Sequence, residues 1–408
     1  MAIMMTSSLT MEAGDFFWGN LAGSMEAIDA GTTTVLDHAH MNWSPNHSPQ
    51  AIAGTITSGV RSIFGYTPYV GLQSHKPAIE FRQDLLAPWV METFEKLATS
   101  QSLSDAESRV KMGLGFDLYF LPKEMVQDMF SKVRSLGAGI ITSHYIRPKG
   151  EADSSLPALL HSYGLLDERI VLSHAGGATP EDAKLMSEAK SYVSVTPSAE
   201  QSMCVGPSVA FREDLPGMEK VCSLGIDCQC INSSSIVNEM RTSLQTARAH
   251  DSIAHQKQGK LPKTGFHTCA EAFNMGTIQG ARALCMEKEI GSIQVGKKAD
   301  LVVFDAMSPA MIGAAQRDPV MAIVLHSSIG DVDAVIVDGQ FRKRNGKLLP
   351  VQVTKWQDEN NFEETDESIS WGFVAGQLLA LQQRFLSKLP EYDLPELETA
   401  IKELFHMP

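Results

Sequence analysis

Histidines and acidic residues stand at the ends of several apolar runs in this 408-residue chain. The run VCSLGID ends at Asp227, ITSHY carries His144, and IVLSHAGG carries His174. The end of a buried strand is an unfavourable place for a charged group unless a cation or a substrate lies opposite it. Imidazoles and carboxylates gathered in one place can bind a divalent metal and leave a position open for water. Histidines and acidic residues at strand ends could therefore support metal-assisted hydrolysis.

Further polar side chains follow other apolar runs and are candidates for contacts with a substrate. They are Arg147, His38, His40, Tyr119, Ser198 and Glu200. His38 and His40 form an H-x-H pair, whose rings share one face of an extended strand. Each candidate also has a purely structural interpretation; Asp227, for example, is also placed to cap a helix that opens after Asn232 and Ser233. The recurrence of polar residues on strand after strand favours function.

The elements that must position these residues alternate between predicted strands and predicted helices, a pattern typical of a parallel sheet covered by helices. Seven predicted strands carry polar residues at their C-terminal ends, which converge on one pocket in a parallel α/β barrel. A closed barrel needs eight strands. The regular spacing of the later strands places the deficit at the N-terminus. Residues 1–288 are therefore expected to form an incomplete (β/α) TIM-like barrel.

Three longer segments within this region are expected to be single elements. Residues 79–99 and residues 268–284 are each expected to be helical, and residues 191–203 to be a strand broken at Pro197.

The pattern changes at Glu289. Residues 289–353 show alternating apolar residues and turn signals, which predict a small β module with a hairpin around Asn345-Gly346. Residues 354–408 are acidic and then carry apolar residues at helical spacing, which predicts a C-terminal helical tail. The sequence therefore predicts three domains: barrel, β module and tail.

Composition limits the class of protein. A net charge of −14 argues against nucleic acid and anionic membranes as partners. No apolar run reaches the length of about 18 residues that a membrane span needs, and the first residues lack the features of a signal peptide. Six cysteines without a C-x-x-C pair suit a reducing compartment. Cys228 and Cys230 form a C-x-C pair beside Asp227. They could be metal ligands, but the favoured interpretation is that they are small apolar residues that line a loop. We expect a cytoplasmic protein.

Several segments together resemble the amidohydrolase superfamily, and most closely its cytosine deaminase and triazine chlorohydrolase branch. They are GTTTVLDHAHM, IITSHY, IVLSHAGG, SVTPS, LGIDCQCINSSSIVNEMR, TCAEAFNMGTIQGARAL and IGSIQVGKKADLVVFDA. The resemblance spans residues 15–349 and implies a barrel with an appended β-sandwich and one divalent metal, usually zinc or iron. It implies that His144, His174 and Asp227 form the metal site and that His174 and Asp227 are also catalytic.

Two departures from the branch affect this expectation. The H-x-H pair that normally ends strand one is absent, because the chain begins after that point. His38 and His40 fall on strand two, so no ligand role is assigned to them. Arg147 stands where the branch has a glutamate for proton transfer, and it either binds an anionic group of the substrate or neutralises an acidic neighbour. We therefore expect an N-terminally truncated barrel with a reduced β-sandwich, and either a retained zinc ion or no metal.

The function expected from these features is hydrolysis of a carbon–nitrogen or carbon–halogen bond in a small molecule, by water that a metal activates. The alternatives are a metal-free lyase, decarboxylase or cyclase of secondary metabolism, and a non-catalytic protein that binds a small molecule. The resemblance also implies a homodimer.

Overall fold

The computed structural model describes residues 2–83, 85–147, 155–206, 208–261, 267–357 and 361–404. The chain divides into two compact units, of which the first comprises Met1–Met25, Asp37–Gly115 and Pro350–Pro408, and the second Glu26–Leu36 and Phe116–Leu349. The division into three domains at residues 288 and 353 stays a proposal. No helix in the described part of the chain is both long and apolar enough to cross a membrane.

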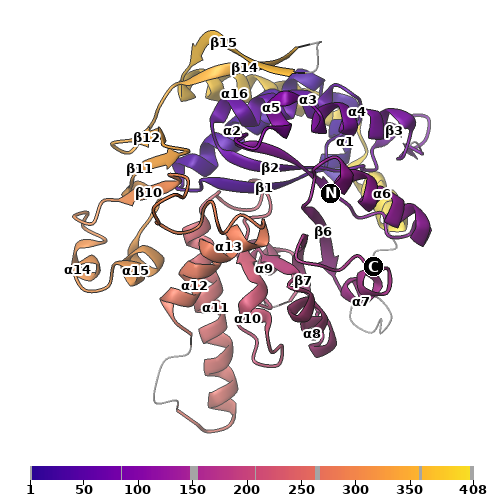
Figure 1. Ribbon diagram of the computed structural model, residues 1–408. Coiled ribbons are helices and arrows are strands. Elements are labelled where there is room, and N and C mark those ends of the chain that lie inside the picture. Colours follow the sequence, from indigo (N-terminus) through magenta and orange to yellow (C-terminus); the bar gives the residue numbers. More distant parts are fainter. Residues whose placement is uncertain are drawn as a thin grey trace. The chain divides into compact units, whose positions relative to one another are not determined.

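Seven strands of the described residues form one sheet in the order β1-β2-β5-β6-β7-β8-β9 (Figure 1). They are β1 (Thr34–Ala39), β2 (Arg61–Tyr66), β5 (Val110–Gly115), β6 (Ile141–Ile146), β7 (Ile170–Gly176), β8 (Tyr192–Val195) and β9 (Cys222–Leu224). The pairings β2–β5, β6–β7, β7–β8 and β8–β9 are parallel. A closed barrel has eight strands, so the expected fold, an α/β barrel-type sheet that lacks one strand, is confirmed.

The first unit holds the N-terminal helices together with the C-terminal elements. Its other elements are α1 (Ala2–Thr10), most of α2 (Ala13–Asp29), α3 (His47–Ser58), β3 (Leu72–Ser74), β4 (Glu80–Phe81), α4 (Pro88–Ala98), α5 (Gln101–Ser104), β14 (Val351–Gln357), β15 (Asn361–Ile369), α16 (Trp371–Lys388) and α17 (Leu394–Leu404). Met5, Leu72, Leu397 and Ile401 form one buried cluster, which ties α1 to α17. The β14–β15 hairpin packs on α3, and the Thr354 amide donates to Thr57 Oγ1 at 2.9 Å.

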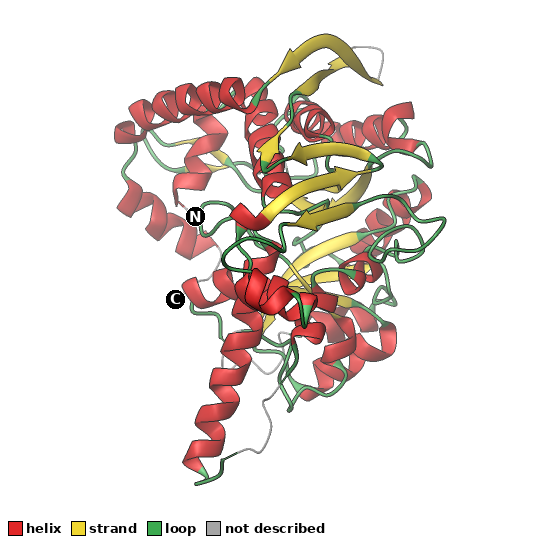
Figure 2. Ribbon diagram, turned by 90° about the vertical axis from the view of Figure 1, so that its left-hand side faces the viewer, coloured by secondary structure: helices red, strands yellow, loops and turns green. Residues whose placement is uncertain are grey.

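The second unit holds β6 to β9 with their helices and an antiparallel sheet. Its helices include α6 (Lys123–Ser135), α7 (Leu156–Ser162), α8 (Pro180–Ala189), α9 (Pro197–Ser202), α10 (Met218–Val221), α11 (Ile236–Lys257), α12 (Cys269–Met275) and α13 (Ile278–Ala283). Helix α11 packs against α9 and α12 (Figures 1 and 2). The antiparallel sheet has the order β10 (Leu301–Phe304), β11 (Val332–Val337), β12 (Gln340–Arg344) and β13 (Lys347–Leu348).

The predicted hairpin within this antiparallel sheet is confirmed. Strands β12 and β13 pair antiparallel, with Arg344 opposite Lys347. Asn345 and Gly346 connect them and have φ values of 51° and 70°. Two consecutive residues with positive φ are the signature of a two-residue hairpin turn, and Asn-Gly is the favoured pair for it.

Four expected elements differ from the structure, and prolines and a glycine account for three of the differences. The helix expected over residues 79–99 begins only at Pro88, and the strand expected over residues 191–203 gives way to α9 at Pro197. Proline favours the first position of a helix, and the residue before it avoids helical backbone. The helix expected over residues 268–284 divides into α12 and α13 at Gly276 and Thr277. The start of the expected helical tail instead forms the end of strand β14 and strand β15.

The two end strands of the seven-stranded sheet line one cavity of about 930 Å³. Leu36 of β1 and Ser223 and Leu224 of β9 contribute to its wall, together with Ile278 and Ala281 of α13. The wall therefore contains residues of both β1 and β9, the first and last strands of the sheet. In a closed barrel, the first and last strands would be joined by hydrogen bonds.

Candidate metal centre

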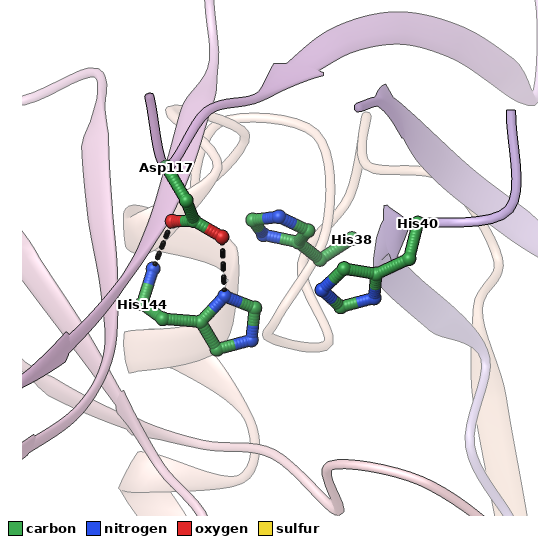
Figure 3. Close-up of side chains that lie close together, drawn as sticks. All are labelled: His38, His40, Asp117 and His144. Atoms are coloured by element: carbon green, nitrogen blue, oxygen red, sulfur yellow. Dashed lines mark hydrogen bonds and ion pairs between the residues drawn. The ribbon is translucent and has the colours of Figure 1, made fainter. Parts of the chain in front are cut away.

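Four side chains near strand ends gather into one cluster. His38, His40, Asp117 and His144 each offer a ligand atom, and these atoms all lie within 4.8 Å of one another (Figure 3). All four side chains are half-buried. Three imidazoles and one carboxylate form a donor set of the kind that binds zinc in proteins, so the cluster is consistent with zinc binding.

Asp117 and His144 form a close pair within this cluster. The backbone N–H of His144 donates to Asp117 Oδ1 at 2.8 Å, and His144 Nδ1 lies 2.7 Å from Asp117 Oδ2 (Figure 3). Burial by itself would lower the pKa of His144. The hydrogen bond with Asp117 and the negative charges of Asp117 and Asp227 more than offset it, so this pKa lies above its usual value. A carboxylate on Nδ1 fixes the orientation of the ring and leaves Nε2 for a metal.

His38 and His40 lie at the end of β1, and their rings stack with centroids 4.6 Å apart. The ring of His40 also meets the ring of Tyr69 edge-on, at 4.9 Å. Gly115, the last residue of β5, leaves room for His38, because a Cβ atom there would lie 2.9 Å from His38 Nε2. Asp37, the residue before His38, is also unusual. Burial raises its pKa to about 6, although Asn20 donates a hydrogen bond to its carboxylate.

His174 lies near the end of β7 in a β-bulge. The pairing of β6 with β7 shifts register after His174, and His174 and Ala175 have φ values of 72° and 55°. His174 is 4% exposed, and its Nδ1 lies 2.8 Å from Thr196 Oγ1. Glu200 Oε1 lies 3.8 Å from the same nitrogen and accepts the backbone N–H of Thr196 at 2.8 Å. The bulge therefore aims an imidazole that Thr196 and Glu200 hold in place. Its ring stacks on that of His144, with centroids 5.8 Å apart.

Asp227 is exposed and follows β9 by three residues. Its φ of 66° is unusual for a residue with a side chain. The helix that follows begins at Ile236, and its cap is Ser235, whose hydroxyl accepts the Asn238 amide. The interpretation of Asp227 as a helix cap is therefore wrong.

Three other candidates have their polar groups engaged within the second unit. Arg147 Nη1 donates to Asp182 Oδ2 at 3.0 Å. The Tyr119 hydroxyl lies 2.6 Å from Ser143 Oγ, and burial raises the pKa of this phenol. The amide and hydroxyl of Ser198 donate to the carboxylate of Glu239, at 2.9 Å and 2.6 Å. These contacts support structural roles, and for Arg147 they support the interpretation that it neutralises an acidic neighbour.

Asp117 was missed by the sequence-based choice of candidates, although a signal for it exists. It follows β5 by two residues in GFDLYF, and the rule that selected the other strand ends applies to it equally. His38 and His40 were assigned to substrate contacts, whereas the structure gathers them with His144. His174 and Asp227 are outside the four-residue cluster found among the described residues, so their role as metal ligands stays a proposal.

The sheet and its strand-end cluster define a barrel-type α/β protein with a metal-binding donor set. The sequence profile of the Amidohydrolase family matches residues 138–342, which is half of the chain. The chain belongs to the amidohydrolase family.

Characterised relatives extend the similarity over most of the chain. A 5-methylthioadenosine/S-adenosylhomocysteine deaminase of Moorella thermoacetica is 26% identical over 370 residues, covering 85% of this chain and 76% of the relative. A 5′-deoxyadenosine deaminase of Methanobrevibacter smithii is 27% identical over 354 residues, covering 84% and 74%. These coverages give no support to the expected N-terminal truncation.

Two solved structures share the fold. One is an adenosine deaminase of Xanthomonas campestris with bound zinc, which matches with a TM-score of 0.72 and 17% sequence identity. The match covers 94% of this chain and 78% of the adenosine deaminase chain. Atrazine chlorohydrolase of Arthrobacter aurescens, in complex with zinc and atraton, has a TM-score of 0.71 at 16% identity and covers 93% and 80%.

Proposed function

We propose that this protein hydrolyses a carbon–nitrogen bond of a small molecule with the help of a divalent metal, and that the reaction is deamination of an adenine nucleoside. The cluster of His38, His40, Asp117 and His144 carries the proposal, because it is a zinc-type donor set beside the ends of parallel strands. The substrate class comes from the relatives, whose names describe deamination of methylthioadenosine, S-adenosylhomocysteine and 5′-deoxyadenosine.

In this proposal, His38, His40 and His144 hold the metal and Asp117 orients His144. Both carboxylate oxygens of Asp117 contact His144, one at the backbone N–H and one at Nδ1, which is the arrangement of an orienting carboxylate. Three imidazole ligands leave a coordination position open, as catalytic zinc sites do. When bound, a divalent metal acts as a Lewis acid and makes water a nucleophile at neutral pH.

Asp227 and His174 are proposed to move protons. Deamination adds water to the carbon that carries the amino group and releases ammonia, so the water must lose a proton and the leaving nitrogen must gain one. Asp227 is an exposed carboxylate whose charge acts on His144, which supports a role as the base. Nδ1 of His174 is engaged by Thr196 Oγ1, which leaves its other nitrogen for exchange with a substrate.

The sequence-based metal site of His144, His174 and Asp227 remains a second proposal, and the two sets share His144. Zinc content of purified variants separates them. Loss of zinc from His38→Ala with retention in His174→Ala supports the first set, and the opposite result supports the second. His161→Ala, on the surface helix α7, is the matched control and is expected to keep the metal of the unchanged protein.

The reaction is tested by incubating the zinc-loaded protein with 5′-deoxyadenosine, methylthioadenosine and S-adenosylhomocysteine and measuring released ammonia. We expect the protein to release ammonia. A chelator should abolish this release, and added zinc should restore it. A protein that holds stoichiometric zinc and binds these nucleosides without releasing ammonia contradicts the reaction. A protein that releases ammonia without any metal contradicts the role of the metal.

We also propose that the protein is a homodimer, that it is cytoplasmic and that it acts in secondary metabolism. Helix α16 supports the dimer, because it exposes Leu379 and Leu386, which are seven residues apart and lie on one face of the helix. Exposed apolar side chains on one face mark interaction surfaces. Light scattering of the purified protein decides between monomer and dimer.

A further inference from the structure

Two thiols lie in contact in the loop that carries Asp227. The Sγ atoms of Cys228 and Cys230 are 3.0 Å apart. Cys230 is exposed and Cys228 is half-buried. The backbone N–H of Ile231 donates to the carbonyl of Cys228 at 3.1 Å, which closes the loop into a tight turn around the two thiols. The turn therefore holds two sulfur atoms together at a place that solvent reaches.

We propose that Cys228 and Cys230 are a redox-active dithiol that reacts with small disulfides such as oxidised glutathione to form an intramolecular disulfide. A disulfide bond needs its sulfur atoms about 2 Å apart, so thiols 3.0 Å apart need only a small shift. A bond that closes a ring over three consecutive residues in an exposed loop is strained, and strained or exposed disulfides are the labile ones that reduction reverses.

The reaction balances through two exchanges. The exposed Cys230 attacks one sulfur of oxidised glutathione, forms a mixed disulfide and releases one molecule of reduced glutathione. Cys228 then attacks Sγ of Cys230, the protein disulfide forms, and the second molecule of reduced glutathione leaves. Two protein thiols are oxidised and one glutathione disulfide is reduced, and the protons of the two protein thiols pass to the two leaving thiolates.

The order of attack follows from the surroundings of the two thiols. Cys228 is half-buried, whereas Cys230 is exposed. Cys230, which is more exposed, meets the oxidant first, and Cys228 has only to displace a sulfur atom already beside it.

Oxidation is expected to regulate the site through Asp227, and this part rests on the proposed function. Asp227 precedes Cys228 directly, has a φ of 66° and is the base of the proposed reaction. A new ring beginning at the next residue changes the backbone freedom of Asp227. We expect oxidised protein to deaminate about tenfold more slowly than reduced protein, a coupling of ordinary size between two linked sites.

The chemical part is tested on the full-length protein with oxidised glutathione, alkylation of the remaining thiols and mass spectrometry of peptides. We expect a Cys228–Cys230 disulfide in the unchanged protein. Cys228→Ser is expected to stop at a glutathione adduct on Cys230, and Cys230→Ser to leave Cys228 free for alkylation. Cys204, which is exposed and has no neighbouring thiol among the described residues, serves as the internal control and forms only an adduct. A stable adduct on Cys230 beside an alkylated Cys228 in the unchanged protein overturns the proposal.

Activity measured on the same samples tests the regulatory part. We expect dithiothreitol to restore the rate of oxidised protein, and the double variant C228S/C230S to be insensitive to oxidised glutathione. Equal rates of the oxidised and reduced protein overturn the coupling to Asp227 but not the dithiol. If the reduced protein has no deaminase activity, the proposed function fails, while the peptide masses still decide whether the disulfide forms.

Discussion

The ends of β6 and β7 present the same side chain in two different settings. His144 ends a regular strand, is half-buried, and has a carboxylate on Nδ1. His174 lies in a bulge with positive φ, is almost fully buried, and has a hydroxyl on Nδ1. A carboxylate makes the ring more basic and a better ligand, whereas a hydroxyl orients the ring without adding a full charge. Two neighbouring histidines therefore have different surroundings, which fits the roles proposed for them: metal binding for His144 and proton transfer for His174.

Removal of His144 is expected to have the largest effect. We expect His144→Ala to lose the bound metal and at least about a thousandfold in kcat, because a catalytic metal contributes several kcal/mol to the transition state. Metal analysis and ammonia release from the same preparation measure both effects. A variant that keeps its metal would show that His144 is not a ligand.

Removal of His174 is expected to slow the reaction without loss of the metal. We expect His174→Ala to lower kcat about a hundredfold, the lower end of the range for general acid–base catalysis, while zinc content stays that of the unchanged protein. Thr196→Val, which removes the hydroxyl beside Nδ1 and keeps the volume, is expected to cost less. If His174→Ala loses its zinc instead, the two histidines have the same role and the contrast fails.

The partner of His144 is the next point to test. Asp117→Asn keeps the size of the side chain and removes its charge, so we expect zinc affinity to fall about 10- to 100-fold, as it does when an orienting carboxylate is lost. Competition with a chelator of known affinity measures the change. Asp128→Asn, on helix α6, provides a charge-matched control away from the cluster. An equal effect of both substitutions would point to net charge rather than orientation.

Asp182 joins the two strand ends, and its removal should affect stability more than chemistry. Asp182 accepts hydrogen bonds from the hydroxyl of Tyr145 in β6 and from Arg147, the residue that follows β6. It also accepts one from the backbone N–H of Thr179, the N-cap residue of α8. Burial alone would raise the pKa of Asp182, but the hydrogen bonds from Ser155, Thr179 and Tyr145 hold it below its usual value. We expect Asp182→Asn to lower the free energy of unfolding by about 3 kcal/mol at neutral pH.

The sign of the pH dependence follows from the lowered pKa. A carboxylate with a depressed pKa in the folded state stabilises the fold above its unfolded pKa, near 3.9, and this contribution disappears as the pH falls through the folded value. The difference between the unchanged protein and Asp182→Asn should therefore shrink below about pH 4. Urea unfolding at pH 7 and pH 3 measures it. A difference that is constant over this range would show that the charge of Asp182 contributes nothing.

The alternation of strands and helices could be predicted because each element carries its own periodicity and its own end signals. Thr179-Pro180 opens α8 with a capping box, and Asn345-Gly346 forms the turn between β12 and β13. His144, His174 and Asp227 were found because each ends an apolar run, which is a local property of the sequence. The fold of the seven-stranded sheet follows from the same local signals.

The composition of the metal cluster could not be predicted in the same way, because it depends on which strand ends meet. Asp117 lies two residues beyond β5, and its partner His144 is 27 residues away in sequence. His38 and His40 were given no ligand role because they align with strand two of the family, and such an alignment gives no distances. Helix starts at Pro88 and Pro197 were also missed, since the apolar pattern outweighed the proline in the prediction.

The positive φ values of His174, Ala175 and Asp227 show what this protein would lose if it were selected for heat resistance alone. Glycine adopts such backbone without strain, whereas another residue costs about 1 kcal/mol. An engineer who sought only a higher melting temperature would place glycine at the ends of β7 and β9 and would remove the imidazole and the carboxylate in doing so. Under the roles proposed for His174 and Asp227, thermostability and turnover are opposed at these positions, and stabilising substitutions are better sought elsewhere in the chain.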